Sequence, residues 1–380
     1  MSVPTVGVIG GGQLARMMVP AAIALGIEIR VLAETEGSSS KLAATAVGDY
    51  RDRDTVLEFA REVDVVTFDH EHVPQDVLQA LVEQGAKVHP GPHALRAAQD
   101  KIVMREMLAE IGAPLPEWAA VANADELQAF IDAHDGAAIL KTPRGGYDGK
   151  GVRVVRAGHD GADWFEQFDR LLVEELVDFR RELAQLVARR PSGETTAWPV
   201  VETVQRDGVC NEVFAPAPGV HGANGRLAEV ALDIAERIAT GLDVTGVLAV
   251  ELFETSDQRL LVNELAMRPH NSGHWTIDGA VTSQFEQHLR AVLDWPLGDP
   301  APLKPHAVMV NILGGPQHGA ITDRFERAWR HHPAAKLHTY GKSARPGRKV
   351  GHVTVVGDEL DEITYQARAA AACFDDEETR

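Results

Sequence analysis

The 380-residue sequence predicts a mixed α/β and α+β protein built from two or three domains. Strand-like and helical segments alternate through residues 1–95, which is typical of a parallel sheet with right-handed crossover connections. After about residue 115 the strand-like segments are mostly spaced as hairpins, which indicates an α+β domain. Two Pro-rich breaks, at 89–95 and 294–305, are the expected boundaries between these parts.

The chain opens with a pattern that several phosphate-binding folds share. The apolar segment 3–9 is expected to form a buried strand, and residues 10–15 follow as G-x-G-x-x-A, a variant of the dinucleotide-binding fingerprint. A second strand, expected over 27–33, ends at Glu34, about where such proteins carry a ribose-binding acid. Glycines and a helix N-terminus suit any other phosphate equally well. A tight turn that binds nothing is the third interpretation.

The remaining elements follow in order along the chain. Strands are expected at 63–69 and 86–91, and a single helix at 95–111, which Gly112 and Pro114 would end. The α+β part has strand-like segments at 137–143, 151–157, 171–177, 182–190, 198–216, 246–255 and 259–266, with a long helix over 223–241. Short strands at 307–314, 336–341 and 349–357 precede a C-terminal helix.

Composition excludes several classes of protein. The formal net charge of −19 argues against a general nucleic-acid binder and against an anionic membrane surface, because both partners need excess Lys and Arg. The two cysteines, Cys210 and Cys373, form no metal or redox motif. There is no visible signal peptide, and no apolar run reaches the ~18 residues of a membrane span. We therefore expect a cytoplasmic protein.

A glycine-rich hairpin at 140–155 is the first candidate for a phosphate site. It contains three cations and four glycines, which are Lys141, Arg144, Lys150, Gly145, Gly146, Gly149 and Gly151. Such a hairpin can fold over a polyphosphate and offer backbone N–H donors together with positive charge. The spacing is not that of a P-loop and no helix follows. An ordinary flexible hairpin is the alternative interpretation.

Two acids interrupt apolar strands on either side of an expected turn at 256–258. Glu251 lies in the segment 246–255 and Glu264 in the segment 259–266, so their carboxylates can meet across a hairpin. An acid in an apolar strand is costly unless it is paired or binds a metal. Two carboxylates and a phosphate are a common way of holding Mg²⁺. The alternative is a pair of solvent-facing acids on an edge strand.

Two loops and one strand end complete the set of candidate sites. The loop 267–276 is dense in hydrogen-bond donors and suggests substrate recognition. The segment 342–349 holds four cations in eight residues of a very acidic protein, which indicates an anion site or, alternatively, a solvated basic loop. The strand at 171–182 runs into an acidic turn. It could offer backbone groups to an adenine and a carboxylate to a ribose.

Four motifs, in this order, give the chain a resemblance to a known family. They are GGGQLARM at 10–17, GGYDGKG at 145–151, NELAMRPHNSGHWT at 263–276 and RPGRKVGH at 345–352. In these motifs the chain resembles the ATP-grasp ligases, and among them the N5-carboxyaminoimidazole ribonucleotide synthase family of purine biosynthesis. The resemblance implies a three-domain ATP-grasp fold, with a Rossmann-like domain at 1–95, an ATP-grasp domain at 96–298 and a small β-rich domain at 299–380.

The resemblance also implies a reaction and its participants. ATP would phosphorylate bicarbonate to carboxyphosphate. The exocyclic amine of 5-aminoimidazole ribonucleotide would then capture the carboxyl group, or the CO₂ released from it. Mg²⁺ is the implied metal, with Mn²⁺ as an alternative. The protein is expected to be a homodimer whose partners are small molecules, with no nucleic acid and no membrane among them.

Carried over position by position, the resemblance implies a role for each motif residue. The nucleotide would be bound by Arg96 and Lys141 at its phosphates, Gly146, Gly149 and Gly151 in a covering loop, Glu174, Glu175 and Val177 along the adenine, Glu182 at the ribose, and Gln205 and Asn263 nearby. The metal would be held by Glu251 and Glu264. The acceptor and bicarbonate region would be lined by Tyr147, Asp148, Lys150, Arg268, His270 and Asn271. The ribonucleotide phosphate would be received by Gln13, Leu14, Lys342, Arg345, Arg348 and Lys349, while Glu71 faces its ribose or imidazole.

The chain departs from the family pattern in places, and three rival functions stay open. Gln205 stands where relatives often carry His, Asp69 and His70 replace a Glu-Phe pair, Met267 replaces Pro, and Lys150 replaces a common Arg. One rival is a formate-dependent ribonucleotide transformylase, which would share the nucleotide machinery. Another is an NAD-linked oxidoreductase, which rests on the first 34 residues alone. The third is a nucleotide-binding regulator without turnover.

Overall fold

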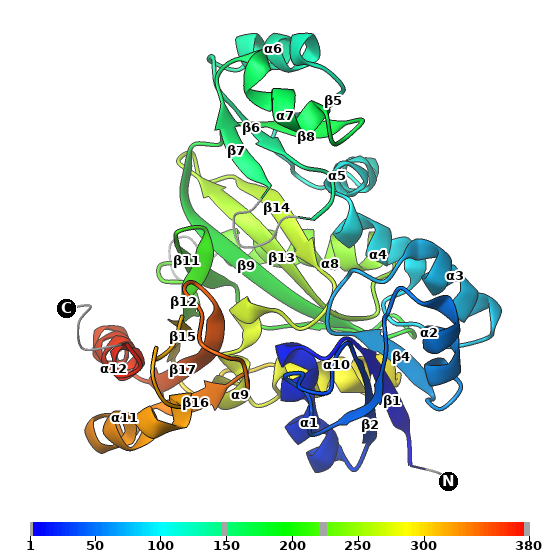
Figure 1. The fold of residues 1–380 in the computed structure, drawn as a ribbon. Helices are drawn as coiled ribbons and strands as arrows, with labels where there is room; N and C mark the ends of the chain where they lie inside the picture. Colours follow the sequence, from blue (N-terminus) through cyan, green and yellow to red (C-terminus); the bar gives the residue numbers. More distant parts are fainter. Residues whose placement is uncertain (1–2, 146–150, 221–225, 376–380) are drawn as a thin grey trace.

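The computed structural model describes residues 3–145, 151–220 and 226–375, and its N-terminal part is a parallel sheet with helices on its faces (Figure 1). The strands are β1 Thr5–Ile9, β2 Glu28–Ala33, β3 Ala44–Val47 and β4 Val65–Phe68, in the order β3-β2-β1-β4. The helices are α1 Gln13–Leu25, α2 Arg53–Ala60 and α3 Gln75–Glu83. The predicted parallel sheet is confirmed. The predicted strand at 86–91 is wrong, because this segment forms only a single bridge, Val88 to Val66.

Two helices, instead of the predicted one, lead from the first part to the second. α4 spans Pro92–Gln99 and α5 spans Lys101–Glu110. Asp100 between them is extended (φ −139°, ψ 117°), and its carboxylate accepts hydrogen bonds from two backbone N–H groups of α5 at 3.0 and 3.2 Å. The single helix expected over 95–111 is wrong because this Asp is the N-cap of a new helix.

The second part begins with a small sheet whose strands run in the order β5-β8-β6-β7. Its elements are β5 Trp118–Val121, α6 Ala124–Ala133, β6 Ala138–Lys141, β7 Val152–Val155, α7 Ala162–Phe165 and β8 Leu171–Glu175. β6 and β7 are antiparallel, with Lys141 opposite Val152, so the glycine-rich segment joins them as the predicted hairpin. In Figure 1 this sheet and α6 form the upper lobe of the molecule.

A large antiparallel sheet forms the centre of the molecule and continues into the C-terminal part. The order is β14-β13-β9-β11-β12-β15-β17-β16, and β10 pairs with β9. The strands are β9 Phe179–Arg189, β10 Thr195–Ala197, β11 Val201–Arg206, β12 Val209–Ala215, β13 Gly246–Thr255, β14 Leu260–Ala266, β15 His306–Leu313, β16 Lys336–Thr339 and β17 Lys349–Gly357. The helices are α8 Arg226–Gly241, α9 Thr276–Gly279, α10 Gln284–Val292, α11 Phe325–His331 and α12 Leu360–Ala372. Because β12 pairs with β15, the C-terminal strands extend the sheet of the second part.

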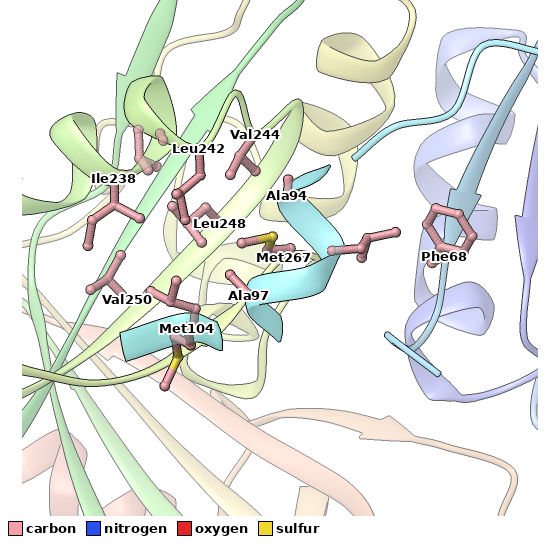
Figure 2. Packing of buried hydrophobic residues seen from close by; sticks show 14 of the residues in the cluster. Phe68, Ala94, Ala97, Met104, Ile238, Leu242, Val244, Leu248, Val250 and Met267 are labelled. Atoms are coloured by element: carbon pink, nitrogen blue, oxygen red, sulfur yellow. The ribbon is translucent and has the colours of Figure 1, made fainter. Parts of the chain in front are cut away.

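The N-terminal and central sheets share one apolar core, and α4 lies between them (Figure 2). Ala94 and Ala97 of α4 lie beside Met267, while Phe68 of β4 lies on the other side of the helix (Figure 2). Met267 is 1% exposed, so the segment that leaves β14 is anchored in this core. Burial of a Met side chain contributes roughly 1.5–3 kcal/mol. This packing fixes the start of the loop 268–274.

Candidate active site

One cleft of about 1730 Å³ lies where the three parts of the molecule meet. Its walls come from the turns 12–14 and 69–76, from both sheets of the second part, and from the loop between β16 and β17. The cleft brings together all but two of the predicted site residues that the structure describes. Those that line it are Gln13, Leu14, Glu71, Lys141, Glu174, Glu175, Val177, Glu182, Gln205, Glu251, Asn263, Glu264, Arg268, His270, Asn271, Lys342, Arg345, Arg348 and Lys349.

The two exceptions have local explanations. Arg96 is on the exposed face of α4, because its neighbours Leu95 and Ala97 face the core. The expectation that Arg96 lines the nucleotide site is therefore wrong, and Lys101, the first residue of α5, lines the cleft instead. Gly151 lies at the base of the hairpin, where its carbonyl accepts a backbone hydrogen bond at 2.9 Å. Gly146, Tyr147, Asp148, Gly149 and Lys150 lie outside the described residues.

The two acids of the β13–β14 hairpin are direct cross-strand partners, as predicted. Glu251 pairs with Glu264, and the register then shifts by one residue, which leaves Asn263 as a bulge next to the pair. Burial and the neighbouring Glu264 carboxylate raise the pKa of Glu251, the expected effect of two acids that share one site. Mg²⁺ is usually held by one or two carboxylates together with phosphate oxygens, so this donor set fits it.

A buried triad of charges fixes Lys141 at the base of the glycine-rich hairpin. The Glu174 carboxylate, 3% exposed, accepts hydrogen bonds from Lys141 Nζ at 2.6 Å and Arg105 Nε at 2.5 Å. Burial favours a higher pKa, but these two cations outweigh it and lower the pKa of Glu174. Lys141 also donates to Asn263 Oδ1 at 3.2 Å, so it is tied to both sheets of the second part. The sequence does not predict Arg105 as a site residue, because its local pattern does not indicate that its partner is the buried acid Glu174.

The strand end 174–177 and two aromatic rings form one wall of the cleft. The Glu175 carboxylate accepts the backbone N–H of Glu117 at 2.9 Å, so it is engaged within the protein. The backbone of the segment, rather than its carboxylates, can therefore face an adenine edge. Phe179 and Phe253 stack with their ring centroids 4.7 Å apart, and both line the cleft. Sequence reasoning did not single out these rings, because aromatic residues in strands usually belong to a core.

Gln205 takes a clear position although it departs from the family pattern. Its Nε2 donates to Glu182 Oε2 at 3.0 Å, and both side chains line the cleft. Burial raises the pKa of Glu182, and the hydrogen bond from Gln205 opposes this shift. The neutral amide therefore contacts Glu182 without adding a group that titrates near neutral pH.

Arg268 connects the loop 268–274 to the N-terminal part. Its Nε donates to Glu71 Oε2 at 2.9 Å. Burial disfavours the cation, but Glu71 outweighs burial and raises the pKa of Arg268. Arg268 therefore keeps its charge inside the cleft. This ion pair joins two predicted site residues that are 197 residues apart in the sequence.

His270 is a neutral hydrogen-bonding group beside the acid pair. Its Nδ1 lies 2.9 Å from Ser272 Oγ, and its Nε2 lies 3.2 Å from Glu251 Oε1. Burial, with help from Arg268, lowers the pKa of His270 well below its usual range. Because Nδ1 accepts from the backbone N–H of Ser272, the single ring proton is assigned to Nε2, the nitrogen that faces the Glu251 carboxylate.

Asn271 is held by a second amide. Its Nδ2 donates to Asn311 Oδ1 at 3.1 Å, and Asn311 Nδ2 donates back to Asn271 Oδ1 at 2.7 Å. Asn311 lies in β15 and also donates to the Cys210 carbonyl at 2.9 Å. The C-terminal extension of the sheet therefore supports the orientation of a side chain in the cleft.

The opening glycine turn is filled in part by the protein's own carboxylates. Asp69 accepts the third backbone N–H of α1 at 2.7 Å, and a Cβ on Gly12 would lie 1.9 Å from its Oδ2. Glu34 accepts the Gly11 N–H at 3.1 Å, and hydrogen bonding with His70 is the main cause that lowers the pKa of Glu34 to about 2. Both features behind the dinucleotide interpretation therefore serve contacts within the N-terminal part.

The basic loop between β16 and β17 reaches the same turn from the other side of the cleft. Lys342 Nζ donates to Gln13 Oε1 at 2.6 Å. Arg16 of α1 donates to the Thr339 carbonyl at 3.0 Å, which ties the start of the loop to the N-terminal part. Lys342 thus faces the opening turn, and the other three cations of the predicted anion site line the same cleft.

Three family models match successive parts of the chain. A ribonucleotide synthetase preATP-grasp domain matches residues 3–99, an ATP-grasp domain matches 106–285, and a phosphoribosylaminoimidazole carboxylase C-terminal domain matches 307–366. The N5-carboxyaminoimidazole ribonucleotide synthase of Mycobacterium tuberculosis (strain ATCC 25618 / H37Rv) is 50% identical over 376 residues, covering 97% of this chain and 87% of the relative. The chain belongs to the N5-carboxyaminoimidazole ribonucleotide synthase family.

Solved structures of N5-carboxyaminoimidazole ribonucleotide synthases share this fold over nearly the whole chain. The Aspergillus clavatus enzyme, in complex with ADP and 5-aminoimidazole ribonucleotide, has a TM-score of 0.87 at 33% identity, covering 98% of each chain. The Thermus thermophilus enzyme has a TM-score of 0.86 at 35% identity, covering 98% of this chain and 99% of that one. The predicted three-domain ATP-grasp fold and ligase class are confirmed. No helix in the described part of the chain is long and apolar enough to cross a membrane.

Proposed function

We propose that this cleft carboxylates the exocyclic amine of 5-aminoimidazole ribonucleotide with ATP and bicarbonate, releasing ADP and phosphate. The observation that carries the proposal is the position of Arg268 between two charged ends of one cleft. Arg268 donates to Glu71 Oε2 at 2.9 Å on the acceptor side, and His270, two residues further on, lies 3.2 Å from Glu251 of the acid pair. A cation so placed can act on a small anion that passes between nucleotide and acceptor.

At the nucleotide end, Lys141 and Lys101 would contact the ATP phosphates, with the hairpin loop 146–151 as their cover. Glu182 would accept the ribose hydroxyls, and the backbone of 175–177 would face the adenine. These roles rest on the family resemblance and on the shared lining of the cleft. A closed loop would also keep water from a carboxyphosphate intermediate.

Glu251 and Glu264 would hold Mg²⁺, with Mn²⁺ as a second candidate ion. The bound ion would supply neutralisation of charge on the transferring phosphoryl group. His270 would keep Glu251 oriented through its Nε2–H, 3.2 Å from the carboxylate. Asn263, in the bulge between the two strands, would stay beside the phosphates because Lys141 holds its oxygen.

At the acceptor end, the ribonucleotide phosphate would lie between the opening turn and the basic loop. The turn offers the side chain of Gln13 and the backbone of Leu14 at the N-terminus of α1. The loop offers four cations, which are Lys342, Arg345, Arg348 and Lys349. Glu71, fixed by Arg268, would face the ribose or the imidazole of the acceptor.

The reaction then divides into two steps whose atoms balance. A bicarbonate oxygen attacks the γ-phosphorus of ATP, and ADP leaves. The acceptor amine then attacks the carboxyl carbon of carboxyphosphate, loses one proton, and expels phosphate as the C–N bond forms. Arg268 would bind the anion through both steps, since its guanidinium keeps its charge in the cleft. Asn271, Tyr147, Asp148 and Lys150 would surround the reacting carboxyl group.

The decisive experiment measures ADP release with ATP and bicarbonate, with and without 5-aminoimidazole ribonucleotide. Strong stimulation by the ribonucleotide, together with a bicarbonate requirement, would support the proposal. Stimulation by formate in place of bicarbonate would point to a transformylase. Binding of ATP without turnover under all these conditions would point to a regulator.

Replacement of Arg268 tests the residue at the centre of the proposal. We expect Arg268→Ala to lower kcat for carboxylation by about 100-fold or more, because the intermediate loses its counter-charge. Arg153→Ala is the control, since Arg153 of β7 pairs with Asp163 of α7 and does not line the cleft. Normal product formation by Arg268→Ala would contradict the role.

The family resemblance supports three coarser proposals. We place the domain boundaries at 95/96 and 298/299, near the gaps between the matched family domains. We propose a homodimer, which sedimentation of the purified chain would test. We propose a cytoplasmic location, which fractionation of the source cells would test.

A further inference from the structure

A fully buried glutamine at the start of α10 holds the loop 268–274 by its backbone. Gln284 is 0% exposed. Its Oε1 accepts the backbone N–H of His270 at 2.8 Å, and its Nε2 donates to the His270 carbonyl at 2.8 Å and to His274 Nδ1 at 2.9 Å. One carboxamide therefore satisfies both backbone groups of His270, as a neighbouring strand would do.

The surrounding contacts leave this arrangement little freedom. The backbone N–H of Gln284 donates to Thr276 Oγ1 at 2.9 Å, and that hydroxyl donates to the Gly273 carbonyl at 2.6 Å. A Cβ on Gly273 would lie 2.4 Å from Gln284 Oε1, so the loop backbone approaches the amide as closely as a glycine permits. The loop is thus held at His270 and His274 by Gln284, and at Gly273 through Thr276 of α9.

Gln284 binds the backbone of His270, which lies in the sequence between Arg268 and Asn271, the two side chains assigned to the reaction. Arg268 lies two residues before His270, and Asn271 follows it directly. A shift of the His270 backbone would move both groups, together with the imidazole that contacts Glu251. Reacting groups tolerate only small displacements, since a misplacement of about 1 Å can cost about 100-fold in rate.

We propose that Gln284 is a positioning residue for carboxyl transfer. Its carboxamide sets the backbone of His270 and thereby aligns Arg268 and Asn271 with the carboxyl group that is transferred. This inference rests on the proposed function, which assigns those two side chains to the bicarbonate and acceptor region. Gln284 itself touches no substrate, because it is buried behind the loop and does not line the cleft.

Gln284→Glu is the sharpest variant. A glutamate keeps the shape and the Oε1 acceptor, but it replaces the donor that faces the His270 carbonyl and His274 Nδ1. We expect the yield of carboxylated product per ADP released to fall, and the KM for bicarbonate to rise by about 10–100-fold. We expect the KM for ATP to stay within about twofold of the parent, because Gln284 makes no contact with Lys141 or Glu182.

The same helix offers a matched control. Gln287 is also 0% exposed, and its carboxamide makes the same two-bond clamp on Gly298, with distances of 2.8 and 2.7 Å. Gln287→Glu should therefore cost similar stability without changing product per ADP. Equal effects of the two variants on coupling, or parent-like coupling in Gln284→Glu, would overturn the proposal. If Gln284→Glu does not accumulate as folded protein, Gln284→Asn, which keeps the amide on a shorter stem, is measured in the same way.

A parallel measurement separates this inference from the proposed function. If Arg268→Ala leaves the bicarbonate KM and the product per ADP unchanged, the assigned role of the loop fails. If Arg268→Ala changes them and Gln284→Glu does not, only the positioning role fails. If both variants lower the product per ADP and raise the bicarbonate KM, both assignments stand.

Discussion

Glu264 is the single residue on which the metal assignment depends most directly. It is paired with Glu251 across the hairpin, and Lys101 Nζ lies 3.5 Å from its carboxylate. We expect Glu264→Gln to lower kcat by about 100-fold and to raise the Mg²⁺ concentration needed for half-maximal rate, because the amide offers no charge to a hard cation. Initial rates at varied Mg²⁺ and fixed ATP measure this.

A neighbouring acid provides the control for that variant. Asp257 lies in the turn of the same hairpin, 61% exposed and paired with Arg259. Asp257→Asn should leave the Mg²⁺ dependence unchanged. A Glu264→Gln enzyme with the parent's Mg²⁺ dependence would mean that the acid pair has another purpose.

Which site residues could be predicted depended on whether their signal is local. Glu251 and Glu264 stood out because acids interrupt apolar strands only for a reason, and the hairpin register then brought them together. Gln284 gave no such signal, since a glutamine at a helix start is ordinary and its partner lies in a separate loop. The sequence does not predict Lys101, because the break at Asp100 lies inside a helical pattern and Lys101 lines the cleft as the first residue of the second helix.

At the scale of elements, α5 connects the two sheets of the second part through hydrogen bonds of Arg105. Arg105, 0% exposed, donates to Glu174 in β8 and to the Asn263 carbonyl in β14, the latter at 2.9 Å. We expect Arg105→Met to lower the free energy of unfolding by roughly 3–5 kcal/mol, because it leaves a buried carboxylate with only Lys141 as partner. It should also raise the KM for ATP. Denaturant titration and initial rates measure the two effects.

An exposed arginine on another helix shows what a surface pair contributes. Arg330 of α11 pairs with Glu326 one turn away, and both side chains are mostly exposed. Arg330→Met should change the free energy of unfolding by less than about 1 kcal/mol. If Arg105→Met were as mild as this control, the two sheets would be held together by apolar packing alone.

The elements themselves were predictable where patterns are local and long. The parallel N-terminal sheet, the β6–β7 hairpin and α8 follow from periodicity and turn residues. The single helix predicted over 95–111 is wrong because Asp100, in the sequence Gln-Asp-Lys at 99–101, ends one helix and caps the next. The joining of β12 to β15 could not be predicted, because two strands almost a hundred residues apart find each other only through tertiary packing.

At the scale of the whole molecule, α10 fastens the N-terminal part to the central sheet. Phe285 and Leu289 share an apolar cluster with the buried face of α1. His288 lies between the two sheets. His288 Nδ1 accepts the backbone N–H of Val247 in β13 at 3.1 Å, and its Nε2 lies 2.8 Å from Thr67 Oγ1 in β4. The neutral ring satisfies one group from each sheet. The cleft depends on this junction, because its walls come from both.

His288 therefore predicts how stability depends on pH. Burial lowers its pKa from 6.5 to about 3. Between these values the unfolded chain binds the proton and the folded chain does not. The contribution of this group to the free energy of unfolding is thus complete above about pH 6.5 and falls as pH drops toward 3, by up to about 1.4 kcal/mol per pH unit.

Other buried histidines add to the slope of stability against pH, so the informative quantity is the difference between variants. His288→Gln should be less stable at pH 7 and show a flatter dependence between pH 6.5 and 4, whereas His159→Gln, at a side chain 85% exposed, should follow the parent curve. Free energies of unfolding at a series of pH values measure both slopes, and identical slopes in His288→Gln and the parent would show that the junction does not exclude the proton.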